Sequence, residues 1–211
     1  MGPVPPGDAI APEGSQLREQ PRPHGTKHKT PSMRRDPIVI VDYDPAWPAM
    51  FEAERARVQP AMDRWLVRPI EHVGSTAIPG LAAKPIIDMV AVVGDIDAAR
   101  HAGEALGPLG WIHAPEPGDA AGRRLSFCAP SVAFRTHHLH VVEDESEGWR
   151  GWLAFRDHLR LHPEIAADYA ALKRNLADRY GADPNERDAY RNGKAAFITN
   201  ITGRAIGSSP P

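Results

Sequence analysis

Residues 71–93 read EHVGSTAIPGLAAKPIIDMVAVV, and this stretch decides the fold. Its pattern predicts a strand that ends at Gly74, a loop interrupted by proline and glycine, and a second strand entered through Pro85. Proline cannot donate a backbone hydrogen bond to a neighbouring strand, so it belongs at the first position of one. Residues 86–93 then form an apolar run of strand length, a pattern typical of a strand covered on both faces of a sheet.

Asp88 is the exception within that apolar run. Burying an unpaired carboxylate is costly, so its side chain is expected to face a metal ion, a cation, several hydrogen-bond donors or a cleft. Upstream, Gly74 and Ser75 form a turn in which backbone N–H groups and a hydroxyl can approach an anion closely. A phosphate-binding turn followed by an acid on a strand is used in nucleotide and metal–phosphate chemistry. The alternatives are an ordinary tight turn and a hydrogen-bonded structural acid.

The composition favours one folded domain in a reducing, intracellular setting. The 211 residues suffice for one domain with a sizeable core, or for one domain plus a tail. The formal net charge of -2 gives no overall field that favours nucleic acid or acidic membranes, so neither partner is expected. Cys128 is the only cysteine, which excludes an internal disulfide framework and a Cys-rich zinc site. No apolar run is long enough to span a membrane, so we expect a cytoplasmic protein, and its oligomeric state stays open.

Residues 1–36 differ in composition from the rest of the chain. They are rich in proline, glycine, serine and charged residues and nearly lack large apolar side chains. Such a segment cannot bury enough apolar area to offset its ordering entropy, so we expect a disordered tail, although a basic nucleic-acid arm is an alternative. The predicted organisation is this tail, one domain over residues 37–205 and a flexible C-terminus over residues 206–211.

The pattern after the tail predicts an α/β (α+β) fold, with strands and helices mixed at first and only helices at the end. Helix boundaries follow the prolines and glycines; His162, for example, ends a helix because a residue before proline disfavours the α conformation. Strands are expected at residues 37–41, 71–73, 86–93, 111–113, 124–128 and 134–142, the last two as a hairpin. Helices are expected at residues 45–66, 95–109, 149–161, 163–180 and 185–205.

Residues 135–142, which read RTHHLHVV, hold a second candidate site. Side chains alternate between the two faces of a strand, so His138 and His140 share one face and the apolar residues share the other. Two imidazoles about 7 Å apart along a strand can bind one metal ion, or one phosphate when protonated. The alternative is a pair of solvent-facing histidines. His137, on the apolar side, is expected to be structural.

The C-terminal helices carry basic residues at matching positions. Pairs at positions i and i+4 project from one helical face, so several helices could each present a cation to a shared cleft. The alternative is that these side chains are solvated on amphipathic helices. The pairs are Arg156 with Arg160, Tyr169 with Lys173, and Tyr190 with Lys194.

Together these residues resemble the GrpB family, a group of small bacterial proteins with a nucleotidyltransferase-like fold. The resemblance spans residues 39–201 and rests on an ordered array of motifs, which is far more specific than any one of them. It implies a nucleotidyltransferase-like mixed sheet flanked by helices, with a run of helices at the C-terminus. The motifs lie at residues 43–47, 71–81, 84–88, 122–124, 135–141, 155–160 and 169–173, and at Tyr190, Lys194, Phe197 and Ile198.

The resemblance also implies roles for the candidate residues. In nucleotidyltransferases a Gly-Ser turn contacts the triphosphate and acids on the next strand hold a divalent metal, Mg²⁺ or Mn²⁺. Asp88 takes the role of the acid here, and His138 and His140 could complete a catalytic and metal site with it. The expected ligands of the nucleotide or its phosphates are Gly74, Ser75, Lys84, Arg123, Arg156, Lys173 and Lys194.

Val90 marks a departure from the pattern of nucleotidyltransferases. These enzymes usually carry a second acid at that position, and a two-metal mechanism needs several carboxylate oxygens. The leading hypothesis is nonetheless an enzyme that transfers a nucleotidyl group from a nucleoside triphosphate to an unknown acceptor with a divalent metal. The alternatives are a non-catalytic module that binds a nucleotide, a coenzyme or another phosphorylated small molecule, and a metal-assisted phosphoester hydrolase.

Overall fold

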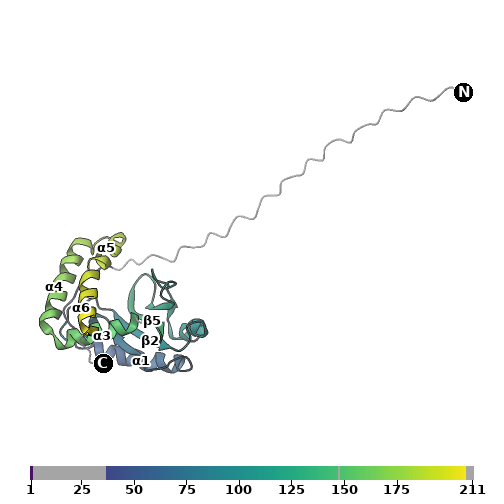
Figure 1. Ribbon diagram of the computed structural model, residues 1–211, viewed down its shortest axis with the longest axis horizontal. Helices are drawn as coiled ribbons and strands as arrows, with labels where there is room; N and C mark the ends of the chain where they lie inside the picture. Colours follow the sequence, from purple (N-terminus) through teal and green to yellow (C-terminus); the bar gives the residue numbers. More distant parts are fainter. Residues whose placement is uncertain (2–36, 147, 208–211) are drawn as a thin grey trace.

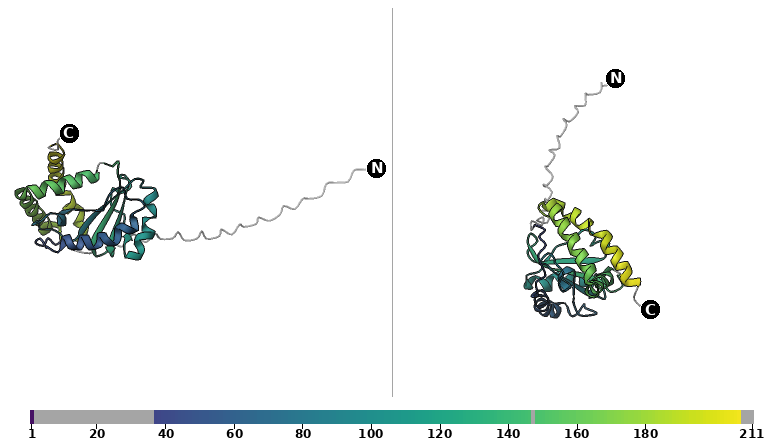
Figure 2. Two further views of the ribbon diagram at one scale, coloured as in Figure 1. Left: turned by 90° about the horizontal axis from the view of Figure 1, so that it is seen from below. Right: turned by 90° about the vertical axis from the view of Figure 1, so that its left-hand side faces the viewer.

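The computed structural model describes residue 1, residues 37–146 and residues 148–207. The tail predicted to be disordered therefore lies, apart from its first residue, outside the described part of the chain, as do residues 208–211. A sheet lies between a group of C-terminal helices, drawn from green to yellow, and helices from the N-terminal half of the domain (Figures 1 and 2). None of the described helices is long and apolar enough to cross a membrane.

The sheet is mixed, as the sequence predicts. Its strands run in the order β1-β2-β5-β4-β3. β2 and β5 pair in parallel, whereas the other neighbouring strands are antiparallel, and the predicted hairpin of β4 and β5 is confirmed. The strand bounds are β1 Glu71–Val73, β2 Ile87–Val93, β3 Ile112–His113, β4 Arg124–Pro130 and β5 Arg135–Glu143.

Six α-helices lie within the described residues, and short 3-10 turns connect several of these elements. Most bounds fall close to those that the prolines and glycines predict. The helices are α1 Trp47–Met62, α2 Ala102–Leu106, α3 Gly148–Leu161, α4 Pro163–Tyr180, α5 Arg187–Asn192 and α6 Ala195–Gly207. The 3-10 turns are Ser75–Ala77, Ala98–His101, Gly107–Leu109 and Pro184–Glu186.

The N-terminal half departs from the prediction in three places. The strand expected at residues 37–41 is reduced to an isolated bridge between Val41 and Ala83. α1 ends at Met62, and Leu66 instead pairs with the end of β2 through another isolated bridge. The helix expected over residues 95–109 consists of one α-helical segment between two 3-10 turns.

The last predicted helix is two helices in the structure. α5 and α6 are separated by a turn at Gly193 and Lys194. A Cβ at Gly193 would lie 2.5 Å from Leu176 Cδ2 of α4, so glycine lets this turn approach α4 closely. The turn gives α5 a direction of its own, which the uninterrupted helical pattern of residues 185–205 does not reveal. α6 continues through Gly207, into the segment expected to be flexible.

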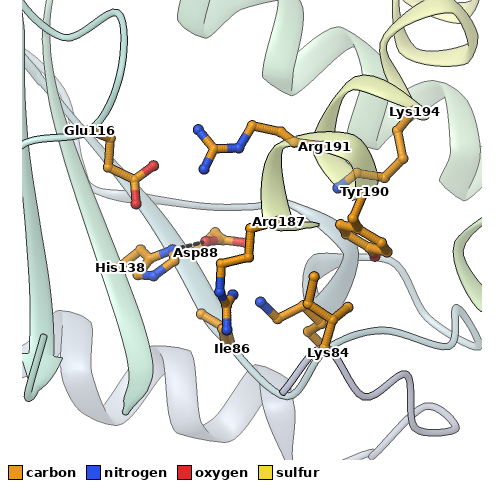
Figure 3. A pocket seen from close by; sticks show the side chains of 10 residues that line it. Lys84, Ile86, Asp88, Glu116, His138, Arg187, Tyr190, Arg191 and Lys194 are labelled. Carbon is orange, nitrogen blue, oxygen red and sulfur yellow. Dashed lines mark hydrogen bonds and ion pairs between the residues drawn. The ribbon is translucent and has the colours of Figure 1, made fainter. Parts of the chain in front are cut away.

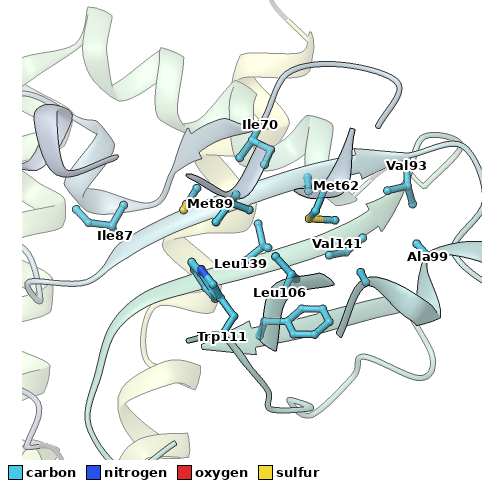
Figure 4. Close-up of a cluster of buried hydrophobic side chains, with 14 of the residues drawn as sticks. Met62, Ile70, Ile87, Met89, Val93, Ala99, Leu106, Trp111, Leu139 and Val141 are labelled. Atoms are coloured by element: carbon cyan, nitrogen blue, oxygen red, sulfur yellow. The ribbon is translucent and has the colours of Figure 1, made fainter. Parts of the chain in front are cut away.

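The two faces of the sheet have different environments. On one face, Met89 of β2 and Leu139 of β5 pack with α1, α2 and Trp111 into the largest apolar core (Figure 4). On the other face, Val90 and Val92 pack against Trp149 of α3. Asp88 lies next to Met89 in the chain, and His138 and His140 flank Leu139. Side chains alternate along a strand, so all three lie on the α3 side of the sheet. The predicted sharing of one face by the two histidines is therefore confirmed.

Candidate functional site

Asp88, His138 and His140 come together because β2 and β5 are adjacent. In the parallel register Asp88 lies opposite His138, and Val90 lies opposite His140. The distance between His138 Nδ1 and Asp88 Oδ1 is 2.9 Å. One ligand atom from each of the three residues lies within 4.8 Å of the others, a spacing that allows one metal ion to be shared. The expected convergence of these side chains is confirmed.

Gly74 fixes the position of the Asp88 carboxylate. The glycine follows β1 and has a φ of 73°, a conformation that other residues rarely adopt. A Cβ at this position would lie 2.5 Å from Asp88 Oδ2, so the carboxylate occupies the space of the missing side chain. Glycine is therefore required here both by the backbone and by the close approach of Asp88.

His140 is oriented from the neighbouring strand β4. Ser126, which is buried, places its Oγ 3.2 Å from His140 Nδ1. A hydroxyl can donate to or accept from a ring nitrogen, so this contact occupies Nδ1 and leaves Nε2 for a ligand. The ring of Trp152 lies 5.3 Å from that of His140, between centroids, and limits its rotation on the other side.

The electrostatics of the site favour the metal-binding forms of two of these residues. Burial raises the pKa of Asp88, but the hydrogen bond from His138 and the positive charges of His138, His140 and Lys84 outweigh it and hold the pKa below its ordinary value. Burial lowers the pKa of His140, against the opposing effect of Asp88. An ionised carboxylate and a neutral imidazole are the forms that coordinate metal ions.

Two cavities meet at Asp88, His138 and Glu116. The first, here called the cationic lobe, holds the basic side chains that Figure 3 shows converging opposite Glu116. The second, here called the aromatic lobe, has a volume of about 320 Å³, a size typical of small-molecule pockets. The cationic lobe is further lined by Lys84, Arg187, Tyr190, Arg191 and Lys194, and the aromatic lobe by Gly74, Ser75, His140, Trp152, Phe155 and Tyr169.

Residues 37–204 match the family described as GrpB protein, which is about four-fifths of the chain. The chain belongs to the GrpB family. It is 39% identical over 183 residues to a UPF0157 protein of Pseudomonas aeruginosa, a match that covers 82% of this chain and 70% of the relative. The crystal structure of the conserved protein GrpB from Enterococcus faecalis superposes with a TM-score of 0.69 and 32% identity, covering 80% of this chain and 98% of that chain.

A weaker likeness links this GrpB-family chain to the Cid1 poly(U) polymerase. The TM-score is 0.42 and the identity 11%, over 67% of this chain and 42% of that chain. A likeness at this level carries no argument about fold or activity.

Two basic residues expected at the site form structural contacts elsewhere in this GrpB-family protein. Arg156 of α3 is buried, donates from Nη1 to Glu71 Oε2 at 2.9 Å and to the carbonyl of His72 at 2.8 Å, and so joins α3 to β1. Lys173 of α4 is also buried and donates from Nζ to the carbonyl of Ala82. Neither residue lines the two lobes. The spacing on a helix predicts a shared face but not what that face packs against.

Arg123 lies at the opposite end of the sheet from Asp88. It donates to Glu143 and to Asp97, with distances of 3.1 Å from Nε to Glu143 Oε2 and from Nη2 to Asp97 Oδ2. Glu143 ends β5 opposite Val93, whereas Asp88 lies near the start of β2. The structure therefore does not bring Arg123 into the cleft. Lys84 and Lys194, by contrast, both line the cationic lobe as the sequence predicts.

Three residues that line the cationic lobe are not among those predicted from the sequence: the acid Glu116 and the arginines Arg187 and Arg191. Glu116 lies in a proline-rich loop, where nothing in the local pattern distinguishes it from a solvated residue. Arg187 and Arg191 have the i and i+4 spacing of the other basic pairs, so the same criterion that selected Lys194 could have identified them.

Proposed function

We propose that this GrpB-family protein is a metal-dependent enzyme that transfers a nucleotidyl group from a nucleoside triphosphate to an acceptor. The observation that carries the proposal is the convergence of Asp88, His138 and His140 at the junction of a cationic and an aromatic lobe. A nucleotide has the complementary chemistry, because it joins a charged phosphate chain to a planar ring.

The donor set discriminates between the two metals that the family resemblance implies. It offers one carboxylate and two imidazoles. Mg²⁺ strongly prefers oxygen ligands, whereas Mn²⁺ and the later divalent transition metals also accept imidazole nitrogen. The residues present therefore fit Mn²⁺ and fit Mg²⁺ poorly. A bound Mn²⁺ would polarise a phosphoryl oxygen and offset the charge of the phosphate chain.

Glu116 is the side chain best placed to handle a proton. It lies at the junction of the lobes and is held by Arg135, whose Nη1 is 2.7 Å from Glu116 Oε1. Burial raises the pKa of Glu116, but the positive charges of His138, His140, Arg135 and Arg191 outweigh it and keep the pKa below its ordinary value. An ionised carboxylate at this position could accept the proton of an acceptor hydroxyl.

The binding-module alternative rests on Val90. Without a second acid on β2 the chain cannot form the usual two-metal carboxylate site of nucleotidyltransferases, so it could bind a nucleotide or coenzyme without turning it over. The hydrolase alternative rests on the same Asp88, His138 and His140 cluster acting on water. The three functions differ in the product released.

The test is to incubate the full chain with each labelled nucleoside triphosphate and Mn²⁺, Mg²⁺ or Zn²⁺. Release of pyrophosphate together with a nucleotidylated acceptor supports transfer. Release of pyrophosphate together with free nucleoside monophosphate supports hydrolysis, in which water is the acceptor. Binding without either product supports the module. Asp88→Asn should abolish the reaction. Asp42→Asn, at an exposed acid paired with Arg174 outside the lobes, should leave it unchanged.

A further inference from the structure

The cationic lobe concentrates positive charge on one side of the Asp88–His138 pair. Lys84 enters it from the loop before β2, Arg187 and Arg191 from α5, and Lys194 from the following turn (Figure 3). Arg187 and Arg191 are one helical turn apart, so they face the same way. The carboxylates in the lining are Asp88 and Glu116, which leaves an excess of positive groups. Such an excess in a partly enclosed cavity favours an anion with several oxygen atoms.

Lys194 is held in place for such a role. Its Nζ lies 4.5 Å from the centroid of the Tyr190 ring, and Tyr190 of α5 is buried in a cluster with Ile38 and with Leu176 of α4. Burial lowers the pKa of Lys194 to about 8, with Asp88 opposing that effect, so the amine is mostly protonated at neutral pH. A cation fixed on an aromatic ring loses less conformational freedom on binding than one on a mobile surface side chain.

The Gly74-Ser75 turn is less suited to a phosphate chain than the family resemblance implies. The space beside Gly74 is filled by Asp88 Oδ2, so a phosphate oxygen cannot take that place. The Ser75 side chain faces the buried Tyr169, whose pKa it lowers against the larger raising effect of burial. The turn also lines the aromatic lobe, where Trp152 and Phe155 provide apolar surface, rather than the cationic lobe.

We propose that α5 and Lys84 bind the phosphate chain of the substrate in the cationic lobe, while the aromatic lobe receives its planar ring. The substrate then spans Asp88 and His138, with its phosphates on the side of Arg191 and Lys194 and its ring beside Trp152. The inference rests on the proposed function and adds to it the orientation of the nucleotide. It also assigns phosphate binding to Arg187 and Arg191.

Calorimetric titration of the full chain with inorganic triphosphate, without metal, tests the cationic lobe alone. Wild type should bind, and Arg191→Gln and Lys194→Gln should each weaken binding about tenfold, the loss expected for one charge-assisted hydrogen bond. Arg100→Gln removes the same charge from an exposed arginine that is paired with Asp97 and lines neither lobe, so it should have no effect. Absence of binding, or equal weakening by Arg100→Gln, would overturn the inference.

The aromatic lobe is tested with a nucleoside triphosphate under the same conditions. Trp152→Ala, or Phe155→Leu if the first variant unfolds, should lower the affinity for the nucleotide several-fold and leave the affinity for inorganic triphosphate unchanged. An equal loss of affinity for the two ligands would contradict the proposed orientation of the nucleotide. Nucleotide turnover that survives unchanged in Arg191→Gln and Lys194→Gln overturns the inference and leaves the proposed function standing. Triphosphate binding through α5 without turnover of any nucleotide supports the inference and contradicts the proposed transferase.

Discussion

Asp88 Oδ2 occupies the space that a side chain at Gly74 would fill, because a Cβ there would lie 2.5 Å from it. The end of β1 and the acid on β2 are thus fitted to each other, and His138 completes the arrangement with Nδ1 at 2.9 Å from the other carboxylate oxygen. Gly74, which the family resemblance implies as a phosphate ligand, also positions the acid of the candidate metal site.

This relationship predicts a large effect of Gly74→Ala. The added methyl group must displace the carboxylate, and the residue keeps an unfavourable positive φ, so we expect a loss of unfolding free energy of about 2 kcal/mol or more. Gly80→Ala is the matched control, because Gly80 also has a positive φ but a Cβ there meets no atom within 4 Å. Chemical denaturation of both variants measures the difference. Equal losses would show that the Asp88 contact contributes nothing beyond backbone strain.

Asp88→Asn separates a metal ligand from a structural acid. Without metal the variant should unfold below the wild-type temperature, because the charge that it removes is stabilised by His138, His140 and Lys84. It should also lose the stabilisation that Mn²⁺ and nucleotide give the wild type. Thermal unfolding with and without these ligands provides the readout. A variant that gains as much from the ligands as the wild type does would contradict the metal role.

The buried amine of Lys173 should make stability depend on pH. Burial lowers its pKa to about 7 in the folded protein, with smaller contributions from Lys194 and Arg174, whereas the unfolded chain keeps a value near 10.5. Between these values the unfolded state binds more protons, so the unfolding free energy should rise with pH, by at most about 1.4 kcal/mol per pH unit from this group. Lys173→Met should remove that part of the slope between pH 7 and 9. An unchanged slope in urea titrations of the variant would show that Lys173 is not the group responsible.

Much of the fold follows from local patterns in the sequence. The apolar run around Asp88 and the alternation around His138 are strong signals, and the parallel pairing of their two strands brings the acid and the histidines together. Local spacing does not report contacts between segments that are distant in the sequence. It therefore does not predict the turn at Gly193, which packs on α4, or the contacts of Arg156 with β1 and of Lys173 with Ala82. Glu116 comes from a loop, where no periodicity constrains the direction of a side chain.

Val90→Asp tests why the site should prefer Mn²⁺ to Mg²⁺. The position lies on the same face of β2 as Asp88 and opposite His140, so a carboxylate there would supply the second acid of the nucleotidyltransferase pattern. Mg²⁺ binding, measured by calorimetry, should become detectable or strengthen about tenfold relative to Mn²⁺ as oxygen ligands are added. Val90 is buried in the same cluster as Val92 and Trp149, so thermal unfolding must first show that the variant is folded, and the wild type serves as the reference. An unchanged preference in a folded variant would mean that ligand type does not set the selectivity.

The most direct test of the account is a calorimetric titration of Mn²⁺ into the full chain and into His138→Ala and His140→Ala. We expect one bound ion per wild-type chain and a loss of affinity of about tenfold or more in each variant. Loss of a residue that only orients a metal ligand already costs about tenfold, so loss of the ligand itself should cost at least as much. His113→Ala, which alters a histidine on β3 outside both lobes, should bind as the wild type does. Absence of Mn²⁺ binding to the wild type, or binding that is unaffected in both site variants, would show that Asp88, His138 and His140 do not form a metal site.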